Sequence, residues 1–426
     1  MDKSEYKIHI VGAGISGLIA AKTLEERGYH PVILEQSDGV GGRVKTDIID
    51  GYQLDHGFQV LLDAYPQVQK HLDLDTLELQ AFLPGAKVFV NGKSSVIGDP
   101  LRNSSLLFPT LFSGVASFSD KLKIFKLNQS LKRKSLDAIF QSESKSTLDY
   151  LKAKGFSDKV ISQFFKPFFS GIFLEPNLGT SSRMFEFVYK MFGEGYAVLP
   201  KAGIGAIAQQ LKSQLQQTTF KFNTEVKSVL DSEIFLANGK TLDTHFTIIT
   251  ANSNSLVGNL KDAGVTWKSC YNLYFEVASQ DIAQPLIGLI AEEEALINNI
   301  FFHNTLETHS KGAHELLSVT VVKDTDLDGV QLVTQVEQDL QKCCNITALQ
   351  HIKTYHIANA LPDLEHLYYD MSPTETEIKP TVFMAGDYLL NGSLNAAMIS
   401  GERAAQGLIE KLEGGAVAEK LTSEYI

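Results

Sequence analysis

The stretch that decides the fold is "VGAGISGLIAA", residues 11–21, which carries a Gly-x-Gly-x-x-Gly at Gly12, Gly14 and Gly17. The preceding "YKIHIVG" predicts a buried strand, and "GLIAAKTLEERG" predicts an amphipathic helix that ends near Gly28. The run "HPVILEQ" predicts a second buried strand. Because both strands are continuously apolar, we expect a parallel sheet covered on both faces and joined by a right-handed crossover. The N-terminal part of the chain is therefore α/β.

The three glycines predict a dinucleotide site. They permit a tight turn, close approach of the backbone to a pyrophosphate, and close packing of helix on strand. The helix that follows directs unpaired N–H groups and its positive end toward that pyrophosphate. Glu35 closes the second strand, where its carboxylate can accept hydrogen bonds from the adenosine ribose and would repel a 2′-phosphate. This context favours a nucleotide site over a structural glycine turn.

The motif alone does not separate NAD from FAD. In "SDGVGGRVKT", Gly41 and Gly42 precede Arg43, and flexible glycines before a guanidinium suit a second contact with a pyrophosphate. An ordinary loop with an exposed arginine is the alternative.

Size, charge and cysteine content narrow the class of protein. The chain has 426 residues, 44% of them apolar, which is enough for a large core in about two domains. A net charge of −12 argues against a nucleic-acid binder and favours small-molecule partners. The three cysteines, Cys270, Cys343 and Cys344, imply no disulfide framework. The start "MDKSEYKIHIVG" leaves no room for a secretory signal, and no apolar run reaches the roughly 20 residues of a membrane span, so we expect a cytoplasmic protein.

Residues 101–190 predict an inserted helical region. Its stretch "DKLKIFKLNQSLKRKSLDAIF" presents a basic face that either is solvated or contacts anionic lipid peripherally. The cations of this face are Lys121, Lys123, Lys126, Lys132, Arg133 and Lys134.

The second half of the chain predicts further strands and a final helix. A hairpin is expected around Asn238-Gly239, followed by the buried run "FTIIT". The runs "SCYNLYFEVAS" (269–279) and "ELLSVTVVKD" (315–324) predict strands of another sheet, and residues 379–414 predict a strand, a glycine-containing loop and a long helix.

Six segments together resemble a known family. The segments "VGAGISGL", "VILEQSDGVGGRVKT" and "LDHGFQVL" resemble the N-terminus of the flavin amine oxidase, protoporphyrinogen oxidase and phytoene desaturase superfamily. The segments "GYAVLPKAGIGAIAQQL", "NTEVKSV" and "VFMAGDYLLNGSLNAAMISGERAA" resemble its middle and its C-terminus. The resemblance is most specific over residues 8–60 and 381–407.

The resemblance implies FAD as cofactor and an α/β fold. It implies a Rossmann-type, glutathione reductase-like FAD-binding domain, interleaved with an α+β substrate domain that contains a helical insertion. The implied segments are 1–82, 197–254 and 375–426 for the FAD-binding domain, 83–196 for the helical insertion, and 255–374 for the substrate-domain sheet.

The resemblance also implies roles for particular residues. Glu35 would hold the adenosine ribose, Arg43 and its glycines the diphosphate, the backbone of Val226 the adenine, and Asp387 the ribityl chain. The start of the last helix would direct its positive end at the flavin pyrimidine, which stabilises an anionic reduced flavin. The predicted cofactor-binding set is Gly12, Ala13, Gly14, Ile15, Ser16, Gly17, Glu35, Gln36, Gly41, Gly42, Arg43, Gly57, Phe58, Val226, Gly386, Asp387, Asn395 and Ala396.

Two positions depart from the family pattern, and both replace glycine with another small residue. They are Ala202 in "PKAGIG" and Ala396 in "LNAAM". Members that attach flavin covalently use a C-terminal cysteine, and residues 385–426 contain none, so we expect noncovalent flavin.

The sequence assigns no catalytic residue and no metal site. Flavin oxidation mainly requires that the donor carbon be held against the flavin in a dry pocket. His56, Phe58 and Gln59 are candidates to line that pocket, with a packed strand edge as the alternative. The segment "HNTLETH", 303–309, is expected at the surface rather than at a metal. Lys166 is a candidate for the lysine near flavin N5 in amine oxidases, but no spacing fixes it there.

The resemblance suggests the substrate class, because "SSRMFEFVYKMFGEGYAVLPKAGIGAI", residues 181–207, is more similar to the desaturases and porphyrinogen oxidases than to the amine oxidases. The aromatic runs 164–173 and 271–275 either wall an apolar cavity or form plain core. We expect a dehydrogenase or desaturase of a hydrophobic molecule, an isoprenoid, carotenoid or porphyrinogen, bound between the helical insertion and the second sheet. A flavin amine oxidase and a noncatalytic binder that resembles the Rab GDP-dissociation inhibitors are the alternatives. The electron acceptor is left open among oxygen, a quinone and NAD(P).

Overall fold

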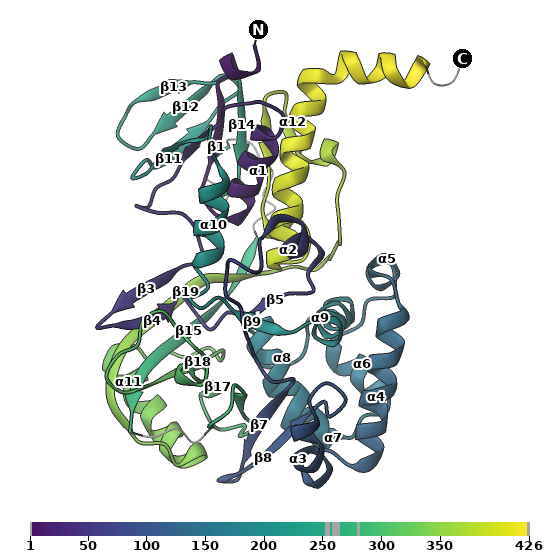
Figure 1. The fold of residues 1–426 in the computed structure, drawn as a ribbon, viewed down its shortest axis with the longest axis vertical. Helices are drawn as coiled ribbons and strands as arrows, with labels where there is room; N and C mark the ends of the chain where they lie inside the picture. The colour runs from purple at the N-terminus through teal and green to yellow at the C-terminus, as the bar shows by residue number, and fades with distance from the viewer. Residues whose placement is uncertain (1, 252–255, 258–264, 279–281, 424–426) are drawn as a thin grey trace.

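The computed structural model describes residues 2–251, 256–257, 265–278 and 282–423, and it has a mixed α/β fold (Figure 1). Residues 254, 255 and 279, which bound segments predicted above, lie outside the described residues.

A six-stranded sheet forms the upper part of the molecule in Figure 1. Its order is β10 (Thr219–Lys221), β2 (Val32–Leu34), β1 (Ile8–Val11), β14 (Phe246–Ile249), β21 (Val382–Met384) and β20 (Glu377–Lys379). The first five strands are parallel, and β20 is antiparallel to β21. Since parallel neighbours need crossover connections, the sheet gathers strands from three distant parts of the chain. The predicted strand, helix and strand at the N-terminus are confirmed.

Helices cover one face of this sheet and a small sheet covers the other. The helices are α1 (Ile15–Glu25), α10 (Ala206–Gln214) and α12 (Leu394–Ser423), with α2 (Pro66–His71) beside α12. The small antiparallel sheet comprises β11 (Val226–Val229), β12 (Glu233–Leu236) and β13 (Thr241–Asp243), and its apolar side chains pack with those of β1 and β14. The turn from β12 to β13 contains Gly239 at φ +83°, so the predicted Asn-Gly hairpin is confirmed.

A seven-stranded sheet lies in the lower part of Figure 1. Its order is β19 (Ala348–Asp363), β15 (Thr266–Val277), β18 (Glu315–Val321), β17 (Ile297–Phe302), β16 (Ile287–Ile290), β7 (Gly85–Val90) and β8 (Lys93–Gly98). Helix α11 (Gly329–Asp339) packs its apolar face on the sheet. The strands predicted from 269–279 and 315–324 are confirmed as β15 and β18.

The segment 83–196, expected to be a helical insertion, begins instead as a hairpin. Strands β7 and β8 join through Asn91 and Gly92, both with positive φ, +50° and +67°. Two successive positive φ angles are typical of a type I′ turn, for which Asn-Gly is the favoured pair. The same dipeptide signal that revealed the later hairpin was therefore present here and was missed.

Helices follow that hairpin. They are α3 (Leu107–Phe112), α4 (Phe118–Arg133), α5 (Leu136–Phe140), α6 (Thr147–Ala153), α7 (Asp158–Val160), α8 (Lys166–Phe173) and α9 (Ser182–Glu194). Small antiparallel pairs join the two halves of the molecule: β3 (Thr46–Ile49) with β4 (Tyr52–Asp55), and β9 (Ala197–Leu199) with β5 (Leu61–Leu62) and β6 (Gln80–Ala81). Within the part of the chain that the structure describes, no helix is long and apolar enough to cross a membrane.

Helices α1 and α12 approach closely because glycine faces the neighbouring backbone. A Cβ built on Gly401 of α12 would lie 2.2 Å from the carbonyl oxygen of Ser16, at the start of α1. Such an approach leaves no room for a side chain, so Gly401 sets the spacing between the two helices.

We predict that Gly401→Ala destabilises the protein by about 1–3 kcal/mol, the usual cost of overpacking. Gly414→Ala is the matched control, since it lies on the same helix and a Cβ there would meet no atom within 4 Å. The control should be neutral or up to about 1 kcal/mol more stable, because alanine favours helix over glycine. Urea unfolding measures both, and equal stabilities for the two variants would refute the packing argument.

Candidate functional site

A cavity of about 1030 Å³ lies where both sheets and the helices α4, α8 and α9 meet. On one side it is bordered by residues that follow the carboxyl ends of the parallel strands: Gly12 after β1, Glu35 after β2, Thr250 after β14 and Gly386 after β21. Ligands of open α/β sheets bind at this edge.

The glycine turn at Gly12 and Gly14 lines the cavity at this edge. Gly12 has φ +106°, and a Cβ there would lie 2.8 Å from the Thr250 hydroxyl. Gly14 precedes α1, and a Cβ on it would meet no protein atom within 4 Å. The open space over Gly14 therefore faces the cavity, beside helix N–H groups that lack intrahelical partners.

The second glycine segment packs directly against the first. The N–H of Gly41 donates to the carbonyl oxygen of Ala13 at 2.9 Å, and a Cβ on Gly42 would lie 3.3 Å from the Cα of Gly14. Both segments border the cavity. The structure thus brings "VGAGISG" and "GVGGR" together on one surface.

Glu35 is held in place by three hydrogen bonds. Its Oε2 accepts from the backbone N–H of Ala13 at 2.7 Å, and its Oε1 accepts from the N–H and the hydroxyl of Ser37 at 2.8 and 2.7 Å. Carboxylate oxygens have about four acceptor sites, so Glu35 can still accept hydroxyl donors from the cavity. Gln36 borders the cavity beside it.

Arg43 and Asp387 are 344 positions apart in sequence and form an ion pair at 2.5 Å. Arg43 also donates to the carbonyl oxygen of Ala360 at 3.1 Å and lies over the ring of Trp267, 5.1 Å from its centroid. The Trp267 indole N–H is buried and has no hydrogen-bond partner among the described residues. All four residues border the cavity.

These features fit FAD. Space over Gly14 at the start of a helix suits an anionic diphosphate. Buried polar groups are nearly always satisfied, so the Trp267 N–H calls for an acceptor on a ligand. The anchored carboxylate of Glu35 supplies acceptors for ribose hydroxyls.

The predicted segment around Phe58 also reaches the cavity. His56, Gly57, Phe58 and Gln59 border it. The Gln59 amide donates to the carbonyl oxygens of Arg43 and His56, both at 2.9 Å, and the ring of Phe58 lies 5.3 Å from that of Phe301. The segment therefore borders the cavity, and Phe58 also packs against the core at Phe82 and Phe301. A contact of these residues with the flavin stays a prediction.

Asp55, just before this segment, is a buried carboxyl. Burial raises its pKa to about 6, although the hydrogen bonds from the Thr46 hydroxyl and the Ile204 N–H act in the opposite direction.

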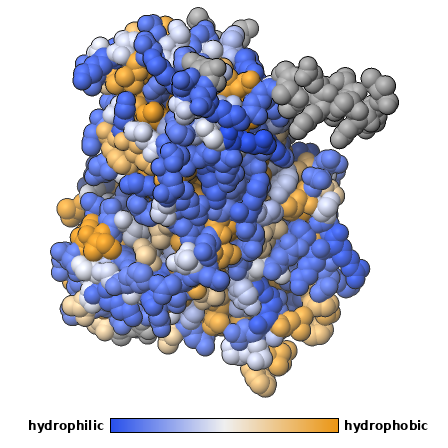
Figure 2. All heavy atoms as spheres, turned by 45° about the horizontal axis from the view of Figure 1, so that its top comes forward, coloured by the Kyte–Doolittle hydropathy of each residue, from blue (hydrophilic) through white to orange (hydrophobic). Residues whose placement is uncertain are grey.

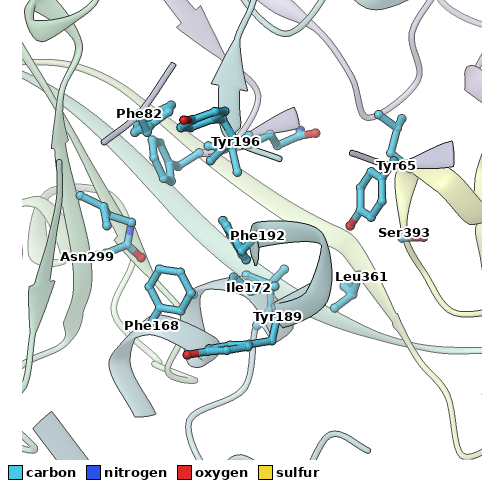
Figure 3. A pocket seen from close by; sticks show the side chains of 18 of the residues that line it. Tyr65, Phe82, Phe168, Ile172, Tyr189, Phe192, Tyr196, Asn299, Leu361 and Ser393 are labelled. Carbon is cyan, nitrogen blue, oxygen red and sulfur yellow. The ribbon is translucent and has the colours of Figure 1, made fainter. Parts of the chain in front are cut away.

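Aromatic side chains wall the far end of the cavity (Figure 3). Helix α8 contributes Phe168 and Ile172, and α9 contributes Tyr189 and Phe192. Figure 3 also labels the aromatic lining residues Phe82, Tyr196 and Tyr65, and the polar side chain of Asn299.

The two predicted aromatic runs have different outcomes. Run 164–173 divides: Phe165, Phe169 and Phe173 are core, while Phe164 and Phe168 border the cavity. Run 271–275 is core or partly buried and does not border the cavity, although its neighbour Cys270 does. Lys166 lies away from the cavity lining and pairs with Glu293 at 3.8 Å.

Five residues of the predicted cofactor set do not border the cavity: Ala13, Gly17, Val226, Asn395 and Ala396. Gly17 has a packing reason, since a Cβ on it would lie 2.1 Å from the carbonyl oxygen of Gly12. The predicted cofactor contacts of these residues stay predictions. The other members, including Ile15, Ser16 and Gly386, border the cavity.

The expectation that 303–309 lies at the surface is wrong for His303 and Leu306, which are both buried. His303 is buried against Phe301 and Tyr274, and burial lowers its pKa to about 4. His309 is exposed and pairs with Glu78. Within the described ranges, no group of three or more His, Cys, Asp or Glu side chains could hold a metal ion.

Sequence reasoning missed Thr250, Trp267, Ala360 and Asn299 as cavity residues. Thr250 was within reach, because it ends a predicted buried strand and the ends of parallel strands share one edge. Trp267 and Ala360 come from the neighbouring strands β15 and β19 of the second sheet, and their position depends on how that sheet meets the first.

The fold and this cavity define an α/β protein with a cavity that fits a dinucleotide. The family model described as "Flavin containing amine oxidoreductase" matches residues 15–409, and the chain belongs to this family of FAD-dependent oxidoreductases. Its cofactor is FAD.

Individual relatives share low sequence identity with this chain, over part of its length. Protoporphyrinogen oxidase 2, chloroplastic/mitochondrial, of Arabidopsis thaliana is 27% identical over 168 residues, which are 39% of this chain and 32% of that protein. The 1-hydroxycarotenoid 3,4-desaturase of Flavobacterium sp. (strain P99-3) is 25% identical over 255 residues, 52% of this chain and 51% of that protein. The matches thus span about a third and about half of these two proteins.

A solved structure shows the same fold. An oxidoreductase from Methanosarcina mazei superposes with a TM-score of 0.70 at 15% identity, covering 94% of this chain and 100% of that chain.

We predict that Gly14→Ala weakens FAD binding by at least about tenfold, because its methyl group occupies the space into which the diphosphate must come. The protein itself should fold normally, since that methyl group meets no protein atom within 4 Å. Gly39→Ala is the matched control, because Gly39 is equally open and does not border the cavity. The measurement is the FAD content of purified protein by absorbance, and equal content in both variants would count against this cofactor position.

Proposed function

We propose that this protein is a dehydrogenase or desaturase that oxidises a hydrophobic small molecule by hydride transfer to noncovalent FAD. In this proposal the FAD-binding unit is Rossmann-type and glutathione reductase-like and comprises 1–82, 197–254 and 375–426. The substrate unit comprises 83–196, which includes the helical insertion, and 255–374. The contribution of all three FAD-binding segments to one parallel sheet supports this division.

The proposed cofactor contacts run along the edge of that sheet. Glu35 accepts hydrogen bonds from the adenosine ribose, and Gly14, Gly42 and Arg43 approach the diphosphate. Asp387, oriented by its ion pair with Arg43, approaches the ribityl chain. The start of α12 at Asn395 and Ala396 directs its positive end toward the flavin pyrimidine.

The observation that carries the substrate class is the aromatic wall continuous with the cofactor edge. When bound, FAD supplies the acceptor for a hydride from a substrate C–H bond. The chain's own residues exclude water and orient an apolar substrate: Phe168, Ile172 and Phe192 on one side and Phe82 on another (Figure 3). Burial of apolar surface against such a wall favours binding by about 25 cal/mol per Å².

Relatives support a polycyclic or polyene substrate. By name, one relative acts on a porphyrinogen and another on a hydroxycarotenoid.

A flavin amine oxidase is the second candidate. The cavity lining includes Asp99, a carboxylate distinct from Glu35 and Asp387, which could pair with a substrate ammonium. Tyr189 and Tyr196 could add cation–π contacts.

Anaerobic mixing of the flavoprotein with polyenes, porphyrinogens and amines separates these candidates. We expect bleaching of the oxidised flavin absorbance with a polyene or a porphyrinogen. Bleaching by amines alone would replace the proposal with the amine oxidase. A protein that binds FAD and is bleached by no compound of the three classes, although dithionite reduces it, would contradict the proposed dehydrogenase.

A further inference from the structure

Helix α3 exposes an apolar face to solvent. Leu107, Phe108, Leu111 and Phe112 are all exposed, and Phe112 has 79% and Phe108 68% of its surface accessible. Large aromatic side chains rarely remain this exposed on a helix, because their burial is worth about 2 kcal/mol each. Figure 2 shows hydrophobic atoms that project at the lower end of the molecule, the end at which Figure 1 places α3.

Helix α4 continues this apolar surface. Phe118, Leu122 and Phe125 are exposed at 70%, 48% and 46%. Their spacing of four and three residues places them on one side of the helix. We call the exposed apolar side chains of α3 and α4, residues 107–125, the α3–α4 face.

The surroundings of this face are basic in an acidic protein. Residues 101–134 contain seven Lys and Arg and a single Asp, whereas the whole chain has a net charge of −12. That acid, Asp120, is buried and accepts hydrogen bonds from Ser117 and Ser157. Lys126, Lys132 and Arg133 are exposed, and no ion pair involves them within the described residues. An apolar face with unpaired cations beside it complements an anionic lipid surface.

The cavity opens on the same face. Leu111, Phe118 and Leu122 are exposed at the surface and also border the cavity, as does Lys132. The same cavity is therefore lined both by residues of the α3–α4 face and by the aromatic wall. A second copy of this chain is a poorer occupant, because a symmetric contact would bring two basic surfaces together.

We propose that the α3–α4 face docks on an anionic phospholipid membrane, with Phe108 and Phe112 entering the acyl layer and the cavity opening toward it. The docking proposal rests only on the exposed apolar side chains and the basic residues around them. The passage of a hydrophobic substrate from the lipid into the cavity rests on the proposed function.

Vesicle co-sedimentation of the FAD-loaded protein tests the docking. We expect binding to phosphatidylcholine vesicles that contain phosphatidylglycerol, and weaker binding to phosphatidylcholine alone or at high salt. The double variants Phe108→Ser with Phe112→Ser, and Lys126→Glu with Arg133→Glu, should each bind at least about tenfold more weakly. None of these four residues borders the cavity, so FAD content should not change.

Matched controls lie elsewhere on the surface. Val330→Ser replaces an apolar side chain that is 82% exposed on α11, and Lys240→Glu with Lys342→Glu makes the same charge change far from α4 in sequence. Both controls should bind vesicles like the wild type.

Three results would overturn the docking proposal: no binding of the wild type to anionic vesicles, equal binding by the phenylalanine variant, or a wild-type dimer that the phenylalanine variant converts to a monomer. The vesicle assay needs no turnover, so it succeeds or fails independently of flavin bleaching by substrates.

Discussion

The close backbone approach at the glycine turn is the constraint on which the rest of the structure depends. Gly17 packs against the carbonyl of Gly12 and Gly42 against Gly14, so strand β1, helix α1 and the second glycine segment meet through their backbones. The Thr250 hydroxyl, just after strand β14, lies against Gly12 and donates to its carbonyl oxygen. These contacts fix the edge of the sheet and leave the space over Gly14 open to the cavity. Charged side chains lie at the same edge of the sheet. The Glu35 carboxylate accepts a hydrogen bond from the Ala13 N–H, and Arg43 forms an ion pair with Asp387.

The chemistry follows from what adjoins this edge. A polar edge that suits an FAD diphosphate passes directly into an aromatic wall from α8 and α9, within one cavity. In the proposed function, hydrogen bonds and charge at the polar edge orient the cofactor, while the apolar wall binds the substrate and excludes water. The exposed residues of α3 and α4 extend the apolar surface to the outside of the molecule.

Much of this arrangement could be predicted from the sequence, because local signals determine it. The glycine spacing, the acid at Glu35 and the "GVGGR" segment each carry their structural reason in a few neighbouring residues. The structure places Gly12, Gly14, Glu35, Gly41, Gly42 and Arg43 at the cavity, while Gly17 packs against Gly12. The Asn91-Gly92 hairpin carried such a signal and was overlooked. Trp267, Ala360 and the buried His303 could not be predicted, since their positions depend on the packing of strands β15, β17 and β19 against distant parts of the chain. The sequence could not assign the aromatic runs to the core or to the cavity, because both are built from the same types of side chain. Helix α8 contributes side chains to both.

A crystal structure of the FAD-loaded protein tests the central claim most directly. We predict the diphosphate over Gly14 beside Arg43, with a ribose hydroxyl donating to Glu35 and the flavin ring directed toward the aromatic wall. FAD bound outside this cavity, or with its diphosphate away from the start of α1, would contradict the account.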